Sequence, residues 1–135
     1  THLQYGESLF QEGQYDEAKQ HFLYGLEHHG QDTRCLMRLA ELAKQEEESE
    51  AERSYLKKVF EIDCLDLDGE YFFSLLTEEE TKTYLTKLES NEQIMSQSTG
   101  LYFGSYAYRA LGNVEKEKAL VMKAQQLDKN KPIKL

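Results

Sequence analysis

Proline and tryptophan are nearly absent from this chain of 135 residues, which holds one proline, Pro132, and no tryptophan. Because proline breaks helices, its absence from the first 131 residues favours helices packed one after another. No apolar run approaches the roughly 18 residues that a membrane-spanning helix needs, so we expect no membrane insertion. Bases are also scarce, because 16 lysines and arginines stand against 25 acids, for a net charge of −9. This balance disfavours a nucleic-acid or anionic-membrane binder, whose surface would be basic.

Cysteine is scarce as well. Cys35 and Cys64 stand far apart and form neither a C-x-x-C pair nor a disulfide framework. We expect two reduced, buried thiols in a cytoplasmic or otherwise reducing compartment. The first residues lack the basic and apolar regions of a signal peptide, and the chain has no initiator methionine. We therefore expect a segment of a longer protein whose targeting signal is missing from this sequence.

Catalytic and cofactor-binding motifs are missing too. The sequence has no glycine-flanked nucleophile elbow and no phosphate-cradling glycine loop. The histidines His2, His21, His28 and His29 show no metal-binding spacing, and the adjacent pair is typical of a solvated helix end. We expect no enzymatic activity, no cofactor and no metal.

One acidic stretch invites comparison with a calcium-binding loop. Asp66 and Asp68 precede Gly69 at the spacing of an EF-hand. However, Cys64 and Leu75 then stand where two further oxygen ligands are required. We expect instead a turn between helices in which the aspartates cap the helix that follows.

Helical periodicity is what the sequence does contain. Apolar or small residues recur in steps of three and four, which marks one face of a helix, at Tyr15, Ala18, Phe22, Gly25 and Leu26. Leu9 and Phe10 lie on an earlier helix, and Gly13 suits the left-handed conformation that ends it. Residues 2–28 therefore predict a helix, a tight turn and a second helix.

The pattern repeats after 34 residues. When the frame is shifted by this interval, the character of the packing positions survives, so that Gly6 matches Ala40, Leu9 matches Ala43, Phe22 matches Leu56 and Leu26 matches Phe60. The acidic run of residues 46–50 takes the place of the turn, and Glu47 replaces its glycine. Such a recurrence is the sequence signature of a helical repeat protein.

The pattern returns near the C-terminus, where Gly112 plays the role of Gly13 and Ala124 that of Gly25. A third, degenerate unit must lie before it. Its pieces are a short apolar helix at residues 71–76, a capping box at residues 77–80, and a helix that continues through Leu88. Residues 89–98 are polar and predict either a linker or an early start to the next helix.

These helix pairs resemble the tetratricopeptide repeat. The residues of the first unit that match the family pattern are Gly6, Phe10, Gly13, Tyr15, Ala18 and Phe22. A similar match near the C-terminus comprises Gly112, Ala124, Leu127 and Asp128. Glu52 and Glu117 depart from the pattern, because they occupy the slot that Ala18 fills.

The resemblance implies an all-α fold, a right-handed superhelical array of antiparallel helix pairs. We expect seven or eight helices in one domain, in units at about residues 1–31, 33–65, 66–97 (degenerate) and 98–131. Pro132 lies where such repeats often carry a proline before the next helix, so we expect the array to continue in a longer parent protein. The alternative is that Ile133 and Leu135 belong to a tail.

In this family the first helices of the units line a concave groove that receives an extended peptide or a partner helix. The groove positions with the strongest candidate contacts are Phe10, Arg34, Met37, Arg38, Glu41, Tyr102, Tyr106 and Arg109; Leu3, Glu7 and Lys44 share their register. Arginines and aromatic rings carry much of the energy of interfaces, and Arg38 and Arg109 could hold a carboxylate by paired hydrogen bonds. Some family members grip a chaperone's terminal carboxylate with lysine and asparagine, but Leu3 and Glu7 stand at those positions, so we reject that activity.

The resemblance therefore predicts a scaffold or adaptor that binds a protein or peptide, without nucleic acid. Two alternatives stay open: a small chaperone for a secreted protein, and a regulatory module that senses a ligand beside other domains of its own parent chain. The acidic run of residues 46–52 is a second candidate docking site, for a basic partner.

Overall fold

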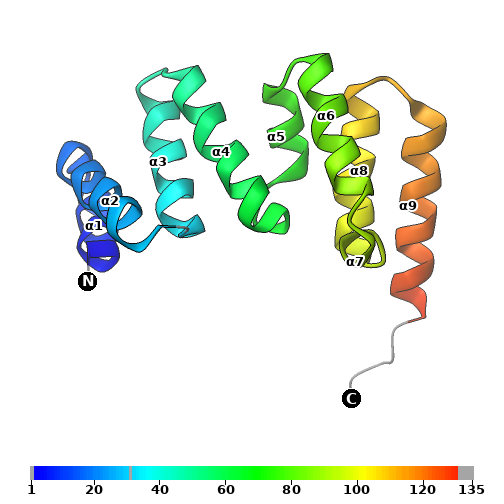
Figure 1. The fold of residues 1–135 in the computed structure, drawn as a ribbon, viewed down its shortest axis with the longest axis horizontal. Coiled ribbons are helices and arrows are strands. Elements are labelled where there is room, and N and C mark those ends of the chain that lie inside the picture. The colour runs from blue at the N-terminus through cyan, green and yellow to red at the C-terminus, as the bar shows by residue number, and fades with distance from the viewer. Residues whose placement is uncertain (1, 31, 131–135) are drawn as a thin grey trace. The chain divides into compact units, whose positions relative to one another are not determined.

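The computed structural model describes residues 2–30 and 32–130, and Figure 1 shows that the described chain is helical throughout. The chain divides into two compact units, Thr1–Leu67 (unit 1) and Asp68–Leu135 (unit 2). The described helices of unit 1 are α1 (His2–Gln11), α2 (Tyr15–His29), α3 (Thr33–Gln45), α4 (Ser49–Asp63) and the 3₁₀ helix η1 (Cys64–Asp66). Those of unit 2 are α5 (Gly69–Leu75), α6 (Glu78–Glu89), α7 (Glu92–Met95), α8 (Ser98–Ala110) and α9 (Val114–Lys129). The all-α prediction is confirmed.

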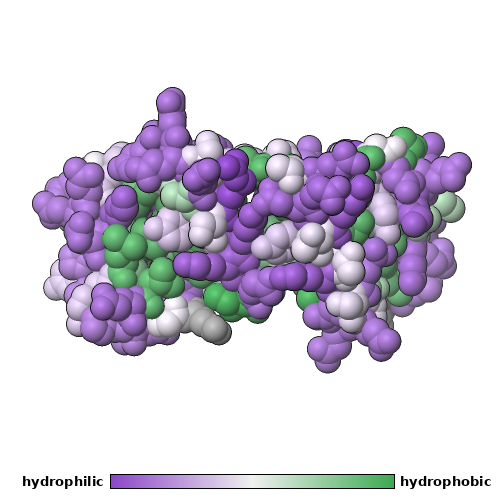
Figure 2. Space-filling model, turned by 45° about the horizontal axis from the view of Figure 1, so that its top comes forward, coloured by the Kyte–Doolittle hydropathy of each residue, from purple (hydrophilic) through white to green (hydrophobic). Residues whose placement is uncertain are grey.

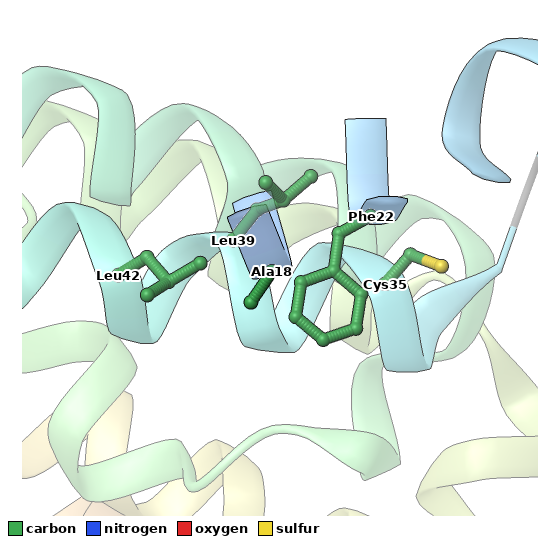
Figure 3. Packing of buried hydrophobic residues seen from close by; sticks show 5 residues of the cluster. All are labelled: Ala18, Phe22, Cys35, Leu39 and Leu42. Atoms are coloured by element: carbon green, nitrogen blue, oxygen red, sulfur yellow. The ribbon is translucent and has the colours of Figure 1, made fainter. Parts of the chain in front are cut away.

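The helices of unit 1 pack in chain order, α1 on α2, α2 on α3 and α3 on α4. Figure 3 shows the centre of this packing, where Ala18 and Phe22 of α2 lie among Cys35, Leu39 and Leu42 of α3. All five side chains are almost fully buried. The 3.6-residue period places them on facing sides of the two helices, and their burial removes apolar surface from water.

Three of the turns between helices share one backbone geometry. Gly13 and Gly112 have φ of 79° and 75°, and Glu47 adopts the same left-handed region with φ of 58°. In each turn the following residue donates its backbone N–H to the carbonyl five residues earlier: Gln14 to Leu9, Glu48 to Ala43 and Asn113 to Tyr108. This pattern is the Schellman motif, which closes the last turn of a helix. The first two of these turns stand 34 residues apart, as the repeat period predicts.

Glu52 and Glu117 occupy the helix position that Ala18 fills in the first pair. This position is shielded from water in all three pairs, α1–α2, α3–α4 and α8–α9. Ala18 is fully buried and Glu52 is 6% exposed. The side chain of Glu117 is 15% exposed and accepts a hydrogen bond from Arg109 Nε at 2.7 Å. A carboxylate shielded from water needs a partner. Arg109 on α8 supplies one, which explains how the pair α8–α9 tolerates an acid at this position.

Unit 2 is organised around α8, which packs against α5, α6, α7 and α9. Its aromatic centre joins Phe72 and Phe73 of α5 to Phe103 of α8, with Phe73 and Phe103 ring centroids 5.3 Å apart. Tyr84 of α6 meets Phe72 edge to face. Edge-to-face pairs of this kind are favourable because the ring edge is positive and the face negative.

The predicted pieces of the degenerate unit are present. Its short apolar helix is α5, and the predicted capping box opens α6, with Thr77 Oγ1 accepting from the Glu80 N–H and Glu80 Oε1 accepting from the Thr77 N–H. Within residues 89–98, for which a linker or an early helix start was expected, Glu92–Met95 form the separate one-turn helix α7, and α8 begins only at Ser98. Pro132, Ile133 and Leu135, on which the prediction of a continuing array depends, lie outside the described residues.

Candidate functional site

A pocket of about 810 Å³ lies within unit 1, beside α1, α3 and η1. It is lined by Leu3, Gln4, Glu7, Ser8, Thr33, Arg34, Met37, Arg38, Glu41 and Asp66, and we call it the unit 1 groove. Six of the positions assigned to a groove from the sequence are among them, namely Leu3, Glu7, Arg34, Met37, Arg38 and Glu41. Phe10 and Lys44, which were also predicted, are not among the lining residues.

Helical periodicity explains why these residues share one pocket. Residues 3, 4, 7 and 8 lie on one face of α1, and residues 33, 34, 37, 38 and 41 lie on one face of α3, because side chains three and four positions apart project together. The core-facing residues Cys35 and Leu39 of α3 fall between them in sequence, and Leu42 follows them directly. The amphipathic pattern that buries one side of α3 therefore leaves the other side to line the unit 1 groove.

Arg38 is the centre of the polar network in the unit 1 groove. Its Nε and Nη2 donate to the two carboxylate oxygens of Glu7 at 2.7 and 2.8 Å, and its Nη1 donates to Glu41 Oε2 at 2.8 Å. The hydrogen bonds to Glu7 raise the pKa of Arg38 above its usual range, so the guanidinium stays charged. The guanidinium also lies 4.4 Å from the ring centroid of Phe10. Phe10, which was predicted to line the groove, thus contacts Arg38 instead of lining the pocket.

Arg34 is the second cation of the unit 1 groove. Its side chain is 73% exposed and donates to both oxygens of Asp32, with Nη2–Oδ2 at 3.2 Å. Asp32 caps α3 by accepting the backbone N–H of Arg34 at 2.9 Å. Burial alone would raise the pKa of Asp32, but the hydrogen bonds from Arg34 outweigh it and the pKa is lowered. A ligand carboxylate would thus have to compete with carboxylates of the protein at both groove arginines.

Sequence reasoning missed four lining residues, Gln4, Ser8, Thr33 and Asp66. The first three could have been predicted from helical spacing, because Gln4 lies three positions before Glu7, Thr33 four before Met37, and Ser8 four after Gln4. Asp66 could not have been predicted in this way, since it reaches the groove from η1, a short element without periodicity.

Figure 2 shows that the surface of unit 1, at the left of the view, combines apolar patches with a hydrophilic surround.

Unit 2 has a smaller pocket of about 440 Å³, which contains two further predicted residues, Tyr106 and Arg109. The guanidinium of Arg109 lies 5.5 Å from the Tyr106 ring centroid, and its Nε is bonded to Glu117. Tyr102, the third predicted residue from α8, is not among the residues that line this pocket. The carboxylate-binding role suggested for Arg109 thus meets the same competition as at Arg38.

Tyr108 of α8 is a buried phenol with a single carboxylate partner. It is 8% exposed, and its hydroxyl donates to Glu89 Oε2 at 2.8 Å. Burial, followed by the hydrogen bond to Glu89, raises the pKa of Tyr108 to about 12. The contact links the end of α6 to α8 and serves the packing of unit 2.

A row of rings on α1 and α2 was not anticipated. His2 and His21 approach each other with their Nδ1 atoms 3.0 Å apart, and the Tyr24 ring lies tilted against the rings of His2 and His28 with centroid distances of 3.9 and 4.0 Å. Tyr5 stacks on His21. The row combines a contact along α2, where Tyr24 and His28 are four positions apart, with contacts between α1 and α2, which the sequence spacing did not reveal.

Two of the three aspartates around η1 act as helix caps, whereas Asp66, for which a capping role was also expected, does not. Asp63 accepts the backbone N–H of Leu65, and Asp68 accepts that of Tyr71. Across residues 2–30 and 32–130, no three histidine, cysteine, aspartate or glutamate side chains are placed to hold a metal ion. The predicted free and buried state of Cys35 and Cys64 is confirmed, and burial raises the pKa of both thiols.

No helix in the described part of the chain is both long enough and apolar enough to cross a bilayer. No protein-family model matches the chain, and no curated protein matches it significantly. The resemblance to the tetratricopeptide repeat therefore depends on the residues of this chain alone.

Proposed function

We propose that this chain is a protein-binding module of tetratricopeptide-like helix pairs, and that its unit 1 groove receives a peptide or helix of a partner protein. The observation that carries the proposal is the convergence of α1 and α3 residues on one pocket. In such repeats the first helix of each pair lines the ligand surface. Here α1 and α3 are the first helices of the two pairs in unit 1.

The common turn geometry supports the repeat architecture. The turns at Gly13, Glu47 and Gly112 use the same left-handed residue and the same long backbone hydrogen bond. Stacking of repeated helix pairs into a right-handed superhelix is the finer part of the proposal, because each pair has an apolar face that its neighbour covers.

The composition of the groove supports a protein ligand. Leu3 and Met37 offer apolar contact, and charged side chains surround them. Interfaces commonly combine an apolar centre with a polar rim. The alternatives of a small chaperone and of a regulatory module of an enzyme stay predictions.

Selection from a displayed library of random peptides of about 15 residues tests the proposal. We expect enriched peptides whose binding shifts the amide resonances of α1 and α3 in the isotope-labelled protein. Met37→Gln should weaken binding by about fivefold to tenfold, because it replaces an apolar contact with a polar one. Ser8→Trp, at an exposed position on the groove wall, should weaken binding by filling the pocket without disturbing the core.

Met122→Gln is the matched control, because Met122 is 69% exposed on α9 and does not line the unit 1 groove. It should leave binding unchanged. Circular dichroism of each variant would establish equal helical content. Peptides that shift resonances elsewhere, or that bind the two groove variants as tightly as wild type, would overturn the proposal, as would the absence of any enriched peptide.

A further inference from the structure

The two units differ sharply in charge. Unit 1 carries 15 acidic residues against seven lysines and arginines, whereas unit 2 carries ten against nine. Nearly all of the net charge of −9 therefore belongs to the unit that contains the groove. An acidic field of this kind attracts cationic partners and accelerates their encounter.

Both arginines of the unit 1 groove already bind carboxylates of the protein. Arg38 places three donors on Glu7 and Glu41, and Arg34 binds Asp32. Each guanidinium thus has a carboxylate partner before any ligand arrives. An anionic ligand would have to displace that partner and would also meet the repulsion of the surrounding acids.

Two carboxylates of the unit 1 groove, Glu41 and Asp66, can accept more hydrogen bonds than they do in the structure. Glu41 is 49% exposed at its side chain and uses only Oε2 to bind Arg38. Asp66 is exposed, and within the described part of the chain its carboxylate makes no hydrogen bond or ion pair. A carboxylate has about four acceptor positions, so both residues can accept further donors from a ligand.

The apolar part of the groove adds a second requirement. Leu3 and Met37 are half-buried and line the same pocket. Methionine adapts its shape to different apolar partners, which suits a surface that receives an aliphatic side chain. A ligand that matches the groove therefore carries both positive charge and apolar anchors.

We infer that the unit 1 groove takes a basic segment of a partner protein, whose lysine or arginine side chains bind Glu41 and Asp66 while its apolar side chains rest on Leu3 and Met37. This inference rests on the proposed function of the groove and names the chemistry of its ligand. It reverses the role expected from the sequence, in which the arginines would hold a ligand carboxylate.

Three fluorescent synthetic peptides of about 15 residues test the inference. They share the same leucine positions and carry lysine, glutamine or glutamate at every polar position. Binding is measured by fluorescence anisotropy at about 0.15 M salt, where long-range attraction between exposed charges is largely screened. We expect the lysine peptide to bind about tenfold more tightly than the glutamine peptide, and the glutamate peptide to bind most weakly.

Two charge-matched double variants locate the effect. Glu41→Gln with Asp66→Asn removes two groove carboxylates and should weaken the lysine peptide by about fivefold or more. Glu27→Gln with Glu48→Gln removes the same charge from exposed positions of unit 1 that do not line the groove. It should change the affinity by less than about twofold.

Equal losses in the two double variants would overturn the inference, because the lysine peptide would then respond only to the general charge of unit 1. Equal binding of all three peptides, abolished by Ser8→Trp, would overturn it and leave the proposed function standing. If library-selected peptides bind the groove and the lysine peptide does not, the inference also fails. If neither binds, the proposed function fails with it.

Discussion

Glu7 and Arg38 are 31 positions apart in the sequence and meet through two hydrogen bonds of 2.7 and 2.8 Å, which join α1 to α3 along the groove. A double-mutant cycle with Glu7→Gln and Arg38→Met should give a coupling energy of about 1 kcal/mol in urea unfolding, because the bidentate pair is partly shielded from water. The exposed pair of Glu78 and Lys82 is the control, and should give only a few tenths (~0.3 kcal/mol). Equal couplings in the two cycles would show that shielding adds nothing.

Gly6 of α1 lies against the ring of Phe22 on α2. A Cβ atom at this position would lie 2.7 Å from Cε1 of Phe22, a fully buried ring. Gly6→Ala should therefore lower the free energy of unfolding by about 1–2 kcal/mol, because overpacking outweighs the gain of about 1 kcal/mol in helix propensity. Thermal and urea denaturation would measure it. Adding Phe22→Leu should cost less in the alanine background than in wild type, and strictly additive losses would argue against the contact.

Glu47 holds a left-handed conformation that favours glycine, with φ of 58°. Glu47→Gly should raise the free energy of unfolding by about 0.5–1 kcal/mol, because it relieves backbone strain at some cost in chain entropy. Gly13→Ala is the opposite change at the equivalent turn, where a Cβ atom would meet no neighbour within 4 Å. It should lower stability by about 1 kcal/mol through strain alone. Shifts of the same sign in the two variants would refute the equivalence of the turns.

His2 gives the fold a dependence on mildly acidic pH. Its pKa is lowered from 6.5, first by burial and then by the charge of His21, so the folded chain favours neutral imidazole. The corresponding stability is present above about pH 6.5 and is lost as the pH falls below it. His2→Gln should therefore flatten the fall in unfolding free energy between about pH 7 and pH 5.5. His29→Gln removes a charge that lowers the pKa of His2 less than burial and His21 do, so it should change the profile less than His2→Gln does. Identical pH profiles for wild type and His2→Gln would contradict the expectation.

Tyr108 gives unit 2 a dependence on alkaline pH. Burial, aided by the hydrogen bond to Glu89, raises its pKa to about 12, so the folded state holds the phenolic proton more tightly than the unfolded state. This stability is complete below about pH 10 and is lost as the pH rises toward and past 12, by about 3 kcal/mol in all. Tyr108→Phe should lose this pH dependence in urea unfolding at alkaline pH. A parallel decline in wild type and variant would assign the effect to other groups.

The helix pairs and their turns could be predicted because their causes are local. Apolar residues at helical spacing, Gly13 and Gly112 at turns, and the capping box at Thr77 each act within a few residues. The one-turn helix α7 escaped prediction because a helix of four residues has no period to detect, and it is held against α8. The turn at Glu47 was predicted although it lacks glycine, because it stands 34 residues after Gly13 in the repeat.

Much of the candidate site was also predictable. The register of α1 and α3 placed Glu7, Met37 and Arg38 on the surface side of their helices, because the period that marks the core marks the opposite face too. Phe10 shares that register but lies beneath Arg38, since a side chain at the margin of the face can turn toward the core cluster. Periodicity assigns a face and cannot assign a rotamer.

The sequence by itself determined the helices, the 34-residue interval between two turns and the face that each helix buries, because these follow from the spacing of side chains along one chain. Only the tertiary structure decided which charges meet. The pairs of Glu7 with Arg38 and of Arg109 with Glu117, and the contact of His2 with His21, each join two helices at a distance set by packing. Because of these contacts, arginines that the sequence suggested for a ligand bind the protein's own acids instead. Asp66, by contrast, is exposed to solvent.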